Sequence, residues 1–311
     1  MPINTKPIQE QAEQEKPRKG SQMDISLSEP HYSFSDIILS HTTSEAVQDV
    51  ISMYTYREKV YDHWGLSKVI KTQKNICANF YGQSGVGKTI TAQAVAEQLG
   101  KKILQVNYAD IESKYVGETS KNLVTIFSEA EKNNAVLLFD EADALLSRRV
   151  TEMRSSTDVS VNQTRSVLLT LLDTFEGMVI FTTNFIDNYD SAFMRRIPYH
   201  IAFELPDEVQ RKRLWEHYLV ENLPHTADTD FLTEISAGCS GADISTATLN
   251  AAFRAARKGL DIIPNDFFKD AVTAIINSKL VNSGMKKLSV VTREVTEEYA
   301  LSQINKKENE K

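Results

Sequence analysis

Short runs of apolar, β-type residues alternate with amphipathic stretches through the middle of this chain. Several runs are apolar at nearly every position, which is typical of strands covered on both faces. Because helical stretches separate the runs, the alternation predicts an α/β domain with three layers around a central parallel sheet of five strands. The predicted strands are residues 76–81, 103–106, 136–139, 179–183 and 200–203.

Helical segments connect the predicted strands, and the C-terminal part of the chain is predicted to be almost entirely helical. After Pro206, helical periodicity continues to about residue 281. We therefore predict an α/β domain over residues 31–207 and a small helical domain over residues 208–281. The clearest helix face inside the first domain follows the i, i+3, i+4, i+7 rule and consists of Leu123, Ile126, Phe127 and Ala130.

Capping residues mark two helix starts in the C-terminal part. Asp207 is a predicted N-cap with Gln210 three residues on, and Ser240 is a second N-cap with Asp243 in its first turn. Gly259 is a natural stop for the helix that Ser240 begins.

Composition narrows the class of protein. Of 311 residues, 41% are hydrophobic and 25% are charged, as in a soluble globular protein. A net charge of −7 argues against broad attraction to nucleic acid or anionic membranes. The apolar runs are too short to span a bilayer and the N-terminus lacks an apolar signal core, so we expect a cytoplasmic protein without a membrane partner. Cys77 and Cys239 are expected to be buried thiols, and the histidines lack metal-ligand spacing.

The two ends are polar. Residues 1–30 contain four prolines and almost no apolar cluster, so we predict a disordered tail there. Residues 282–311 are expected to form a C-terminal extension that is partly disordered.

A glycine-rich loop matches the phosphate-binding pattern G-x-x-x-x-G-K-[ST] at each fixed position. A predicted strand precedes the loop and a predicted helix follows it. Glycines let backbone N–H groups curl around phosphate oxygens. Lys88 is predicted to neutralise the β- and γ-phosphates of ATP, and Thr89 to place its hydroxyl on Mg²⁺. The predicted ATP-binding residues are Gly82, Gln83, Ser84, Gly85, Val86, Gly87, Lys88 and Thr89.

Two adjacent acids follow the apolar run at residues 136–139. Asp140 is predicted to hold Mg²⁺ through water, and Glu141 to polarise an attacking water. Two carboxylates at a buried strand end are costly unless a cation or a reaction uses them. Because a base of this kind needs a water to act on, Glu141 favours ATP hydrolysis over small-molecule kinase chemistry.

Asn184 ends the following apolar strand. Its amide is suited to a hydrogen bond with the γ-phosphate or the attacking water. The residue pattern alone supports equally an asparagine that only forms a turn.

These parts, in this order and spacing, resemble the AAA family within the AAA+ ATPases, over roughly residues 32–280. The stretch Lys114-Tyr115-Val116-Gly117-Glu118-Thr119 is similar to the family's first pore loop. In relatives its aromatic residue grips a polypeptide threaded through a hexameric ring, so the resemblance implies that Lys114, Tyr115 and Val116 contact a protein substrate. From the residues alone, Tyr115 is either an exposed gripping residue or part of the core.

The resemblance assigns further roles. Asn184 lies where the family has its first sensor. Arg195 and Arg196 lie in a stretch similar to the second region of homology, where one or two arginines reach into the neighbouring subunit's ATP site. The usual Gly-Arg-Phe-Asp continuation is replaced by Arg196-Ile197-Pro198, so either arginine is a candidate finger.

Other segments have weaker counterparts. Asp36 and Ile37 lie in a segment similar to the one that contacts adenine. Ala242 lies in the first turn of a helix similar to the lid-domain helix that carries the second sensor, where many AAA+ relatives have arginine, so the resemblance implies that Ala242 lies at the nucleotide. Residues 148–160 lie where a second pore loop is expected.

The resemblance implies a Mg²⁺-dependent ATPase that forms a homo-oligomeric, hexameric ring. Such a ring remodels, unfolds or disassembles protein substrates, reached directly or through an adaptor protein. One alternative is an AAA+ nucleic-acid motor or loader, against which the net charge of −7 argues. The other is an assembly module that nucleotide only switches, which would turn over ATP extremely slowly without a partner.

Overall fold

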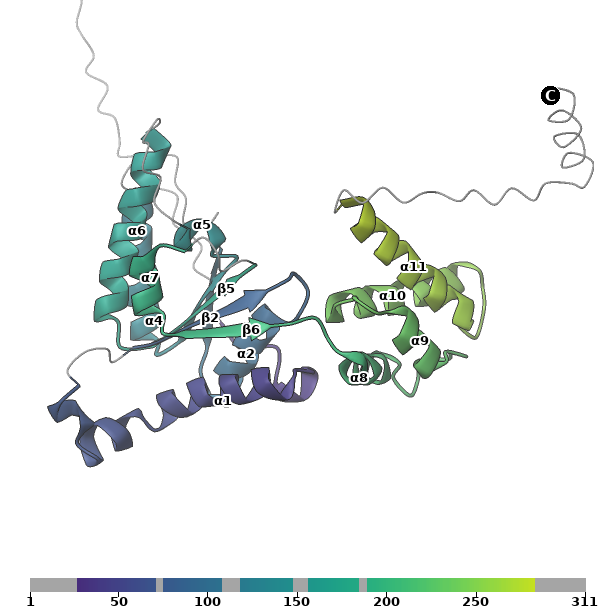
Figure 1. The fold of residues 1–311 in the computed structure, drawn as a ribbon, viewed down its shortest axis with the longest axis horizontal. Helices are drawn as coiled ribbons and strands as arrows, with labels where there is room; N and C mark the ends of the chain where they lie inside the picture. Colours follow the sequence, from purple (N-terminus) through teal and green to yellow (C-terminus); the bar gives the residue numbers. More distant parts are fainter. Residues whose placement is uncertain (1–26, 71–74, 108–117, 148–155, 185–188, 283–311) are drawn as a thin grey trace, which may run out of the picture. The chain divides into compact units, whose positions relative to one another are not determined.

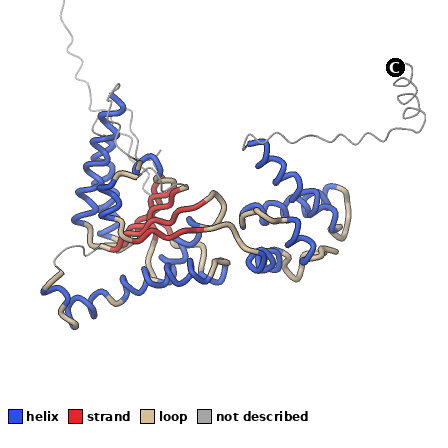
Figure 2. Tube along the Cα trace, in the orientation of Figure 1, coloured by secondary structure: helices blue, strands red, loops and turns tan. Residues whose placement is uncertain are grey.

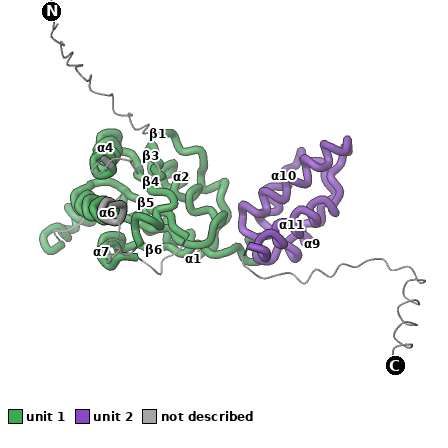
Figure 3. Tube along the Cα trace, turned by 90° about the horizontal axis from the view of Figure 1, so that it is seen from above, with its two compact units in different colours: residues 1–210 green, residues 211–311 purple. Residues whose placement is uncertain are grey.

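The computed structural model describes residues 27–70, 75–107, 118–147, 156–184 and 189–282. The chain folds as two compact units, residues 1–210 and 211–311, which Figure 3 colours separately.

The first unit is built on one twisted sheet (Figures 1 and 2). Within the described residues its six strands run in the order β1-β3-β4-β5-β2-β6. All neighbouring pairs are parallel except β1 with β3, which is antiparallel. The strands are β1 (Leu27–Ser28), β2 (Ile76–Gly82), β3 (Ile103–Asn107), β4 (Val136–Asp140), β5 (Met178–Thr183) and β6 (Tyr199–Phe203).

The five predicted parallel strands are confirmed, each longer by one residue than predicted. The sheet nevertheless has a sixth strand that the prediction missed. Leu27 and Ser28, which we assigned to the disordered tail, pair with Leu104 and Ile103 on β3. A strand of two residues carries no periodic signal, and its position depends on the free edge that β3 offers once the sheet has formed.

Helices cover both faces of the sheet, as Figure 1 shows. On β4, Val136 and Leu138 belong to the core beneath α1 and α2, whereas Leu137 and Phe139 belong to the core beneath α4 and α6. This alternation confirms the predicted three layers, because successive strand residues face opposite sides. The helices of the first unit are α1 (His41–Thr55), α2 (Lys88–Gln98), α4 (Glu118–Lys132), α5 (Asp143–Leu146), α6 (Ser156–Thr174) and α7 (Ser191–Arg196).

The described part of the first unit also contains the 3-10 turn η1 (Phe34–Asp36), the π-helical turn η2 (Lys59–His63) and the 3-10 turn η3 (Leu66–Lys68). No helix in the described part of the chain has both the length and the apolar character needed to cross a bilayer. Cys77 and Cys239 are both buried free thiols, as predicted.

The second unit is helical. Its core includes Trp215 and Phe268, both fully buried, whose rings meet edge to face with centroids 6.3 Å apart. The helices are α8 (Glu208–Tyr218), which starts at the unit boundary, α9 (Thr229–Ile235), α10 (Gly241–Arg257) and α11 (Asn265–Asn282).

The predicted caps are present. Asp207 and Gln210 exchange backbone-to-side-chain hydrogen bonds of 2.9 and 2.8 Å at the start of α8. The Ser240 hydroxyl accepts from the Asp243 N–H at 3.3 Å, and the Asp243 carboxylate accepts from the Ser240 N–H at 2.6 Å. Gly259 has a φ of +66° just beyond α10, the left-handed conformation of a helix stop.

Candidate functional site

The glycine-rich loop joins β2 to α2, and its backbone explains its glycines. Gly82 has a φ of +147°, and a Cβ at this position would lie 2.0 Å from the backbone oxygen of Phe203 on β6. Gly85 and Gly87 have φ values of +81° and +104°. Residues with side chains rarely adopt these conformations, so the loop needs glycine at these positions.

Lys88 opens α2 and is only 8% exposed. Its ammonium donates to the carbonyl oxygens of Gly82 at 2.6 Å and Gln83 at 2.8 Å, and to Oδ1 of Asn184 at 3.2 Å. Burial lowers the pKa of Lys88, while the charges of nearby carboxylates, Asp143 first, act in the opposite direction. The ammonium therefore links the loop to the end of β5, and it can exchange carbonyl partners for phosphate oxygens.

Asp140, at the end of β4, is held by three side chains. Its Oδ1 accepts from the Thr89 hydroxyl at 2.9 Å and from the Thr182 hydroxyl. Its Oδ2 accepts from Nε2 of Gln105 at 3.0 Å. A hydroxyl and a carboxylate oxygen side by side are the hard oxygen donors that Mg²⁺ prefers, so Thr89 and Asp140 fit this ion.

Glu141 adopts a left-handed backbone conformation, with a φ of +52°, and its side chain is exposed. Its N–H donates to the Thr182 hydroxyl oxygen at 3.1 Å. Positive φ values are uncommon in residues other than glycine and cluster at functional sites. Thr182 therefore positions both acids of the pair at once.

Asn184 lies directly after β5, and the structure brings it to the loop. Besides its contact with Lys88, its N–H donates to both carboxylate oxygens of Asp143 at 3.1 and 3.2 Å. The loop, the acidic pair and the predicted sensor thus form one hydrogen-bonded cluster at the carboxyl ends of β2, β4 and β5. Ligands of parallel α/β sheets bind at this edge.

Sequence reasoning missed three members of this cluster: Gln105, Asp143 and Thr182. The pairing register of β4 with β5 could have predicted the place of Thr182. Because β4 and β5 pair Phe139 with Phe181, the residues that follow them end side by side. That register is known only once the strand order is known.

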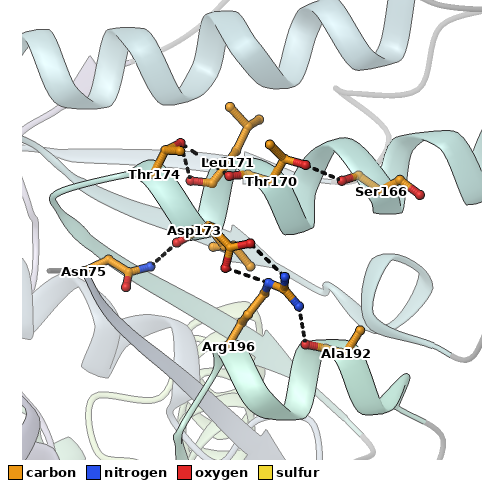
Figure 4. Close-up of polar contacts among 9 residues, drawn as sticks. Asn75, Ser166, Thr170, Leu171, Asp173, Thr174, Ala192 and Arg196 are labelled. Carbon is orange, nitrogen blue, oxygen red and sulfur yellow. Dashed lines mark hydrogen bonds and ion pairs between the residues drawn. The ribbon is translucent and has the colours of Figure 1, made fainter. Parts of the chain in front are cut away.

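The two arginines of α7 have different surroundings. Arg196 makes a two-pronged contact with Asp173 of α6, in which Nε lies 2.8 Å from Oδ1 and Nη2 lies 2.7 Å from Oδ2 (Figure 4). Its Nη1 donates to the carbonyl of Ala192 at 3.2 Å. Hydrogen bonding to Asp173 raises the pKa of Arg196. Arg195 is exposed.

The remaining predicted site residues lie in η1, in α10 and in the predicted pore loops. The Asp36 carboxylate accepts from the backbone N–H and the hydroxyl of Ser33, each at 2.8 Å, so it caps the η1 turn. Ile37 follows η1, and Ala242 is exposed in the first turn of α10 in the second unit. The adenine contact of Asp36 and Ile37 and the nucleotide contact of Ala242 stay predictions. Lys114, Tyr115 and Val116 lie outside the described residues, as do residues 148–155 of the predicted second pore loop.

Comparison with known proteins identifies a family for part of the chain. Residues 78–205 match the model of the ATPase family associated with various cellular activities (AAA). The chain is 34% identical to the proteasome-activating nucleotidase of Methanopyrus kandleri over 212 residues, which cover 66% of this chain and 48% of the relative. It is 31% identical to Protein SAV of Sulfolobus acidocaldarius over 245 residues, covering 76% of this chain and 30% of the relative.

A third relative is the 26S proteasome regulatory subunit 4 homolog of Schizosaccharomyces pombe, 28% identical over 259 residues. That match covers 80% of this chain and 56% of the relative. The chain thus spans about half or less of the length of these curated relatives. The matched region contains the glycine-rich loop, the acidic pair, Asn184 and both arginines. The chain therefore carries an AAA-family ATPase domain.

Proposed function

We propose that this chain is the subunit of a ring-shaped, Mg²⁺-dependent ATPase that remodels protein substrates. The observation that carries the ATPase part is the hydrogen-bonded cluster in which Lys88 contacts Asn184 while Thr89 contacts Asp140. Loop, acid and sensor come from different strands, and their convergence is what phosphoryl transfer to water requires.

Each residue of the cluster has a role set by its chemistry. The loop N–H groups and the Lys88 ammonium hold the ATP phosphates, and Thr89 with Asp140 would hold Mg²⁺. That ion neutralises phosphate charge when bound. Glu141 orients and polarises a water that attacks the γ-phosphorus, the bond to the bridging oxygen breaks, and ADP and phosphate leave. Asn184 fixes the position of the γ-phosphate or of that water.

The proposed ring rests on the resemblance to the AAA family, and the proposed protein substrate rests on that resemblance and on the names of two relatives. Two relatives are named as a proteasome-activating nucleotidase and a proteasome regulatory subunit, which supports a protein substrate for this chain. Arg195 and Arg196 lie on α7, and neither makes a hydrogen bond to the loop or to the acidic pair within the described residues. An arginine from the adjacent subunit is therefore proposed to complete each ATP site, and Tyr115 to contact the threaded polypeptide.

The site assignment is tested with Glu141→Gln. This variant should bind ATP with unchanged affinity and lose turnover by on the order of a thousandfold or more, because the water is no longer polarised. Glu97→Gln, an exposed change near the end of α2, is the matched control and should keep turnover. Normal hydrolysis by Glu141→Gln would show that the acidic pair has been assigned wrongly.

The pore-loop role is tested separately. Tyr115→Ala should hydrolyse ATP at a normal rate and fail to unfold or disassemble a protein substrate captured by the Glu141→Gln variant. Tyr115→Phe keeps the aromatic ring and should retain remodelling. Remodelling by Tyr115→Ala at the normal rate would remove this residue from the proposal.

A further inference from the structure

The pair of arginines on α7 is divided by the geometry of a short helix. Phe193 and Ile197 are fully buried and lie one turn apart, so they define the inward side of the segment. At about 100° per residue, Arg196 lies on the flank of that side, whereas Arg195 lies roughly opposite Phe193. The exposure of Arg195 and the partial burial of Arg196 agree with this position.

All three guanidinium nitrogens of Arg196 donate a hydrogen bond within its own subunit. Nε and Nη2 bond the two oxygens of Asp173, and Nη1 bonds the Ala192 carbonyl one turn earlier on α7. A fork-to-fork contact of this kind fixes orientation as well as distance. Arg196 therefore holds α7 at a set rotation against α6.

The carboxylate of Asp173 lies at a helix end where a negative charge is destabilising. It lies in the last turn of α6, whose free carbonyls give this end of the helix a partial negative charge. The Arg196 guanidinium offsets that charge. The same helix end also contacts the residue just before β2. Nδ2 of Asn75 donates to the Leu172 carbonyl at 2.5 Å (Figure 4).

We infer that Arg195 is the catalytic arginine donated to the neighbouring subunit's ATP site, and that Asp173 and Arg196 are positioning residues that set its direction. The inference rests on the proposed function, since a donated arginine exists only in a ring. It gives different roles to two adjacent arginines that the amino-acid pattern alone does not distinguish. Asp173, which belongs to no phosphate-binding motif, becomes part of the machinery of the adjacent site.

Single substitutions test the division. Arg195→Ala should keep the subunit's affinity for ATP and its melting temperature, and lower kcat on the order of a thousandfold. Arg196→Ala and Asp173→Asn should match each other, each lowering kcat about fivefold with KM for ATP unchanged. The double variant should be no worse than either single variant, and Asp173→Glu should recover part of the rate.

Two controls accompany these variants. Asp270→Asn removes the contact of Asp270 with Arg254 at 2.6 Å, a comparable half-exposed ion pair in the second unit, and should leave kcat within twofold. The second control mixes subunits. A tenfold excess of Glu141→Gln subunits supplies intact arginines, so Arg195→Ala and Asp173→Asn sites should recover most of the rate that wild-type sites show in the same mixture.

Recovery in the mixture distinguishes a misdirected arginine from a damaged subunit. The inference is overturned if Arg196→Ala is as inactive as Arg195→Ala while Asp173→Asn is normal, because Arg196 would then be the donated residue. It also fails if Arg195→Ala keeps turnover, or if Asp173→Asn sites stay slow beside Glu141→Gln subunits. Hydrolysis by Glu141→Gln alone would instead indicate that the proposed ATP site is wrong.

Discussion

At the scale of single residues, the ATP site depends on side chains that do not belong to its recognisable motifs. Thr182 donates to Asp140 and accepts from the Glu141 N–H, so one hydroxyl orients both acids. Gly82 contributes by having no side chain, since β6 passes within reach of where its Cβ would be.

Thr182→Val keeps the shape of the side chain and removes the hydroxyl. ATP turnover should fall about ten- to hundredfold, as is usual when a group that orients a metal ligand or a catalytic acid is lost. Steady-state phosphate release measures this effect. Thr125→Val makes the same change on the exposed face of α4 and should leave the rate unchanged. An unaltered rate for Thr182→Val would mean that the acids are held in place by other groups.

Gly82→Ala should unfold the loop region. The added Cβ meets the Phe203 oxygen at 2.0 Å in a backbone conformation that disfavours side chains, so we expect a loss of about 3 kcal/mol of unfolding free energy and no measurable ATP binding. Gly100→Ala has a φ of +64° with no atom within 4 Å of the new Cβ, and should cost about 1 kcal/mol. Chemical denaturation compares the two. Equal costs would show that backbone strain, and not the contact with β6, limits Gly82.

At the scale of elements, the residues that the sequence predicts as helix caps form caps in the structure. In the second unit, side chains cap the starts of α8, α9 and α10. At α10, Ser240 and Asp243 form a reciprocal cap, and Lys279 of α11 pairs with the same Asp243 carboxylate. The cap therefore serves both the start of α10 and its contact with α11.

Ser240→Ala removes the hydroxyl that accepts from the Asp243 N–H. The unfolding free energy of the second unit should fall by about 1 kcal/mol, the usual cost of losing an N-cap. Thr246→Ala, on the exposed side of the same helix, is the control and should be neutral or slightly stabilising. Circular dichroism at 222 nm during denaturation checks both. A loss as large for Thr246→Ala would place the effect outside the cap.

At the scale of the whole molecule, the proposed site is shared between two copies of the chain. A subunit alone would then hold ATP beside Lys88 without the arginine that completes the site. Turnover per subunit should therefore rise with protein concentration and level off once rings have formed.

Steady-state turnover over a range of concentrations, paired with sedimentation velocity, measures this dependence. Arg195→Ala should assemble at the same concentrations and remain slow throughout. Constant turnover per subunit across a range in which sedimentation shows single chains would contradict a shared site.

The amino-acid sequence alone determined the parallel strands, the glycine-rich loop, the acidic pair and the helix caps. These features are local, because strand and helix periods, glycine conformations and caps depend on residues that are close together in the sequence. The tertiary structure alone decided the edge strand at Leu27–Ser28 and the partners of the motif residues. Thr182 and Gln105 reach Asp140 across 42 and 35 residues, and Asp173 reaches Arg196 across 23. Such contacts depend on strand order and helix rotation, which only the packing of the whole unit sets.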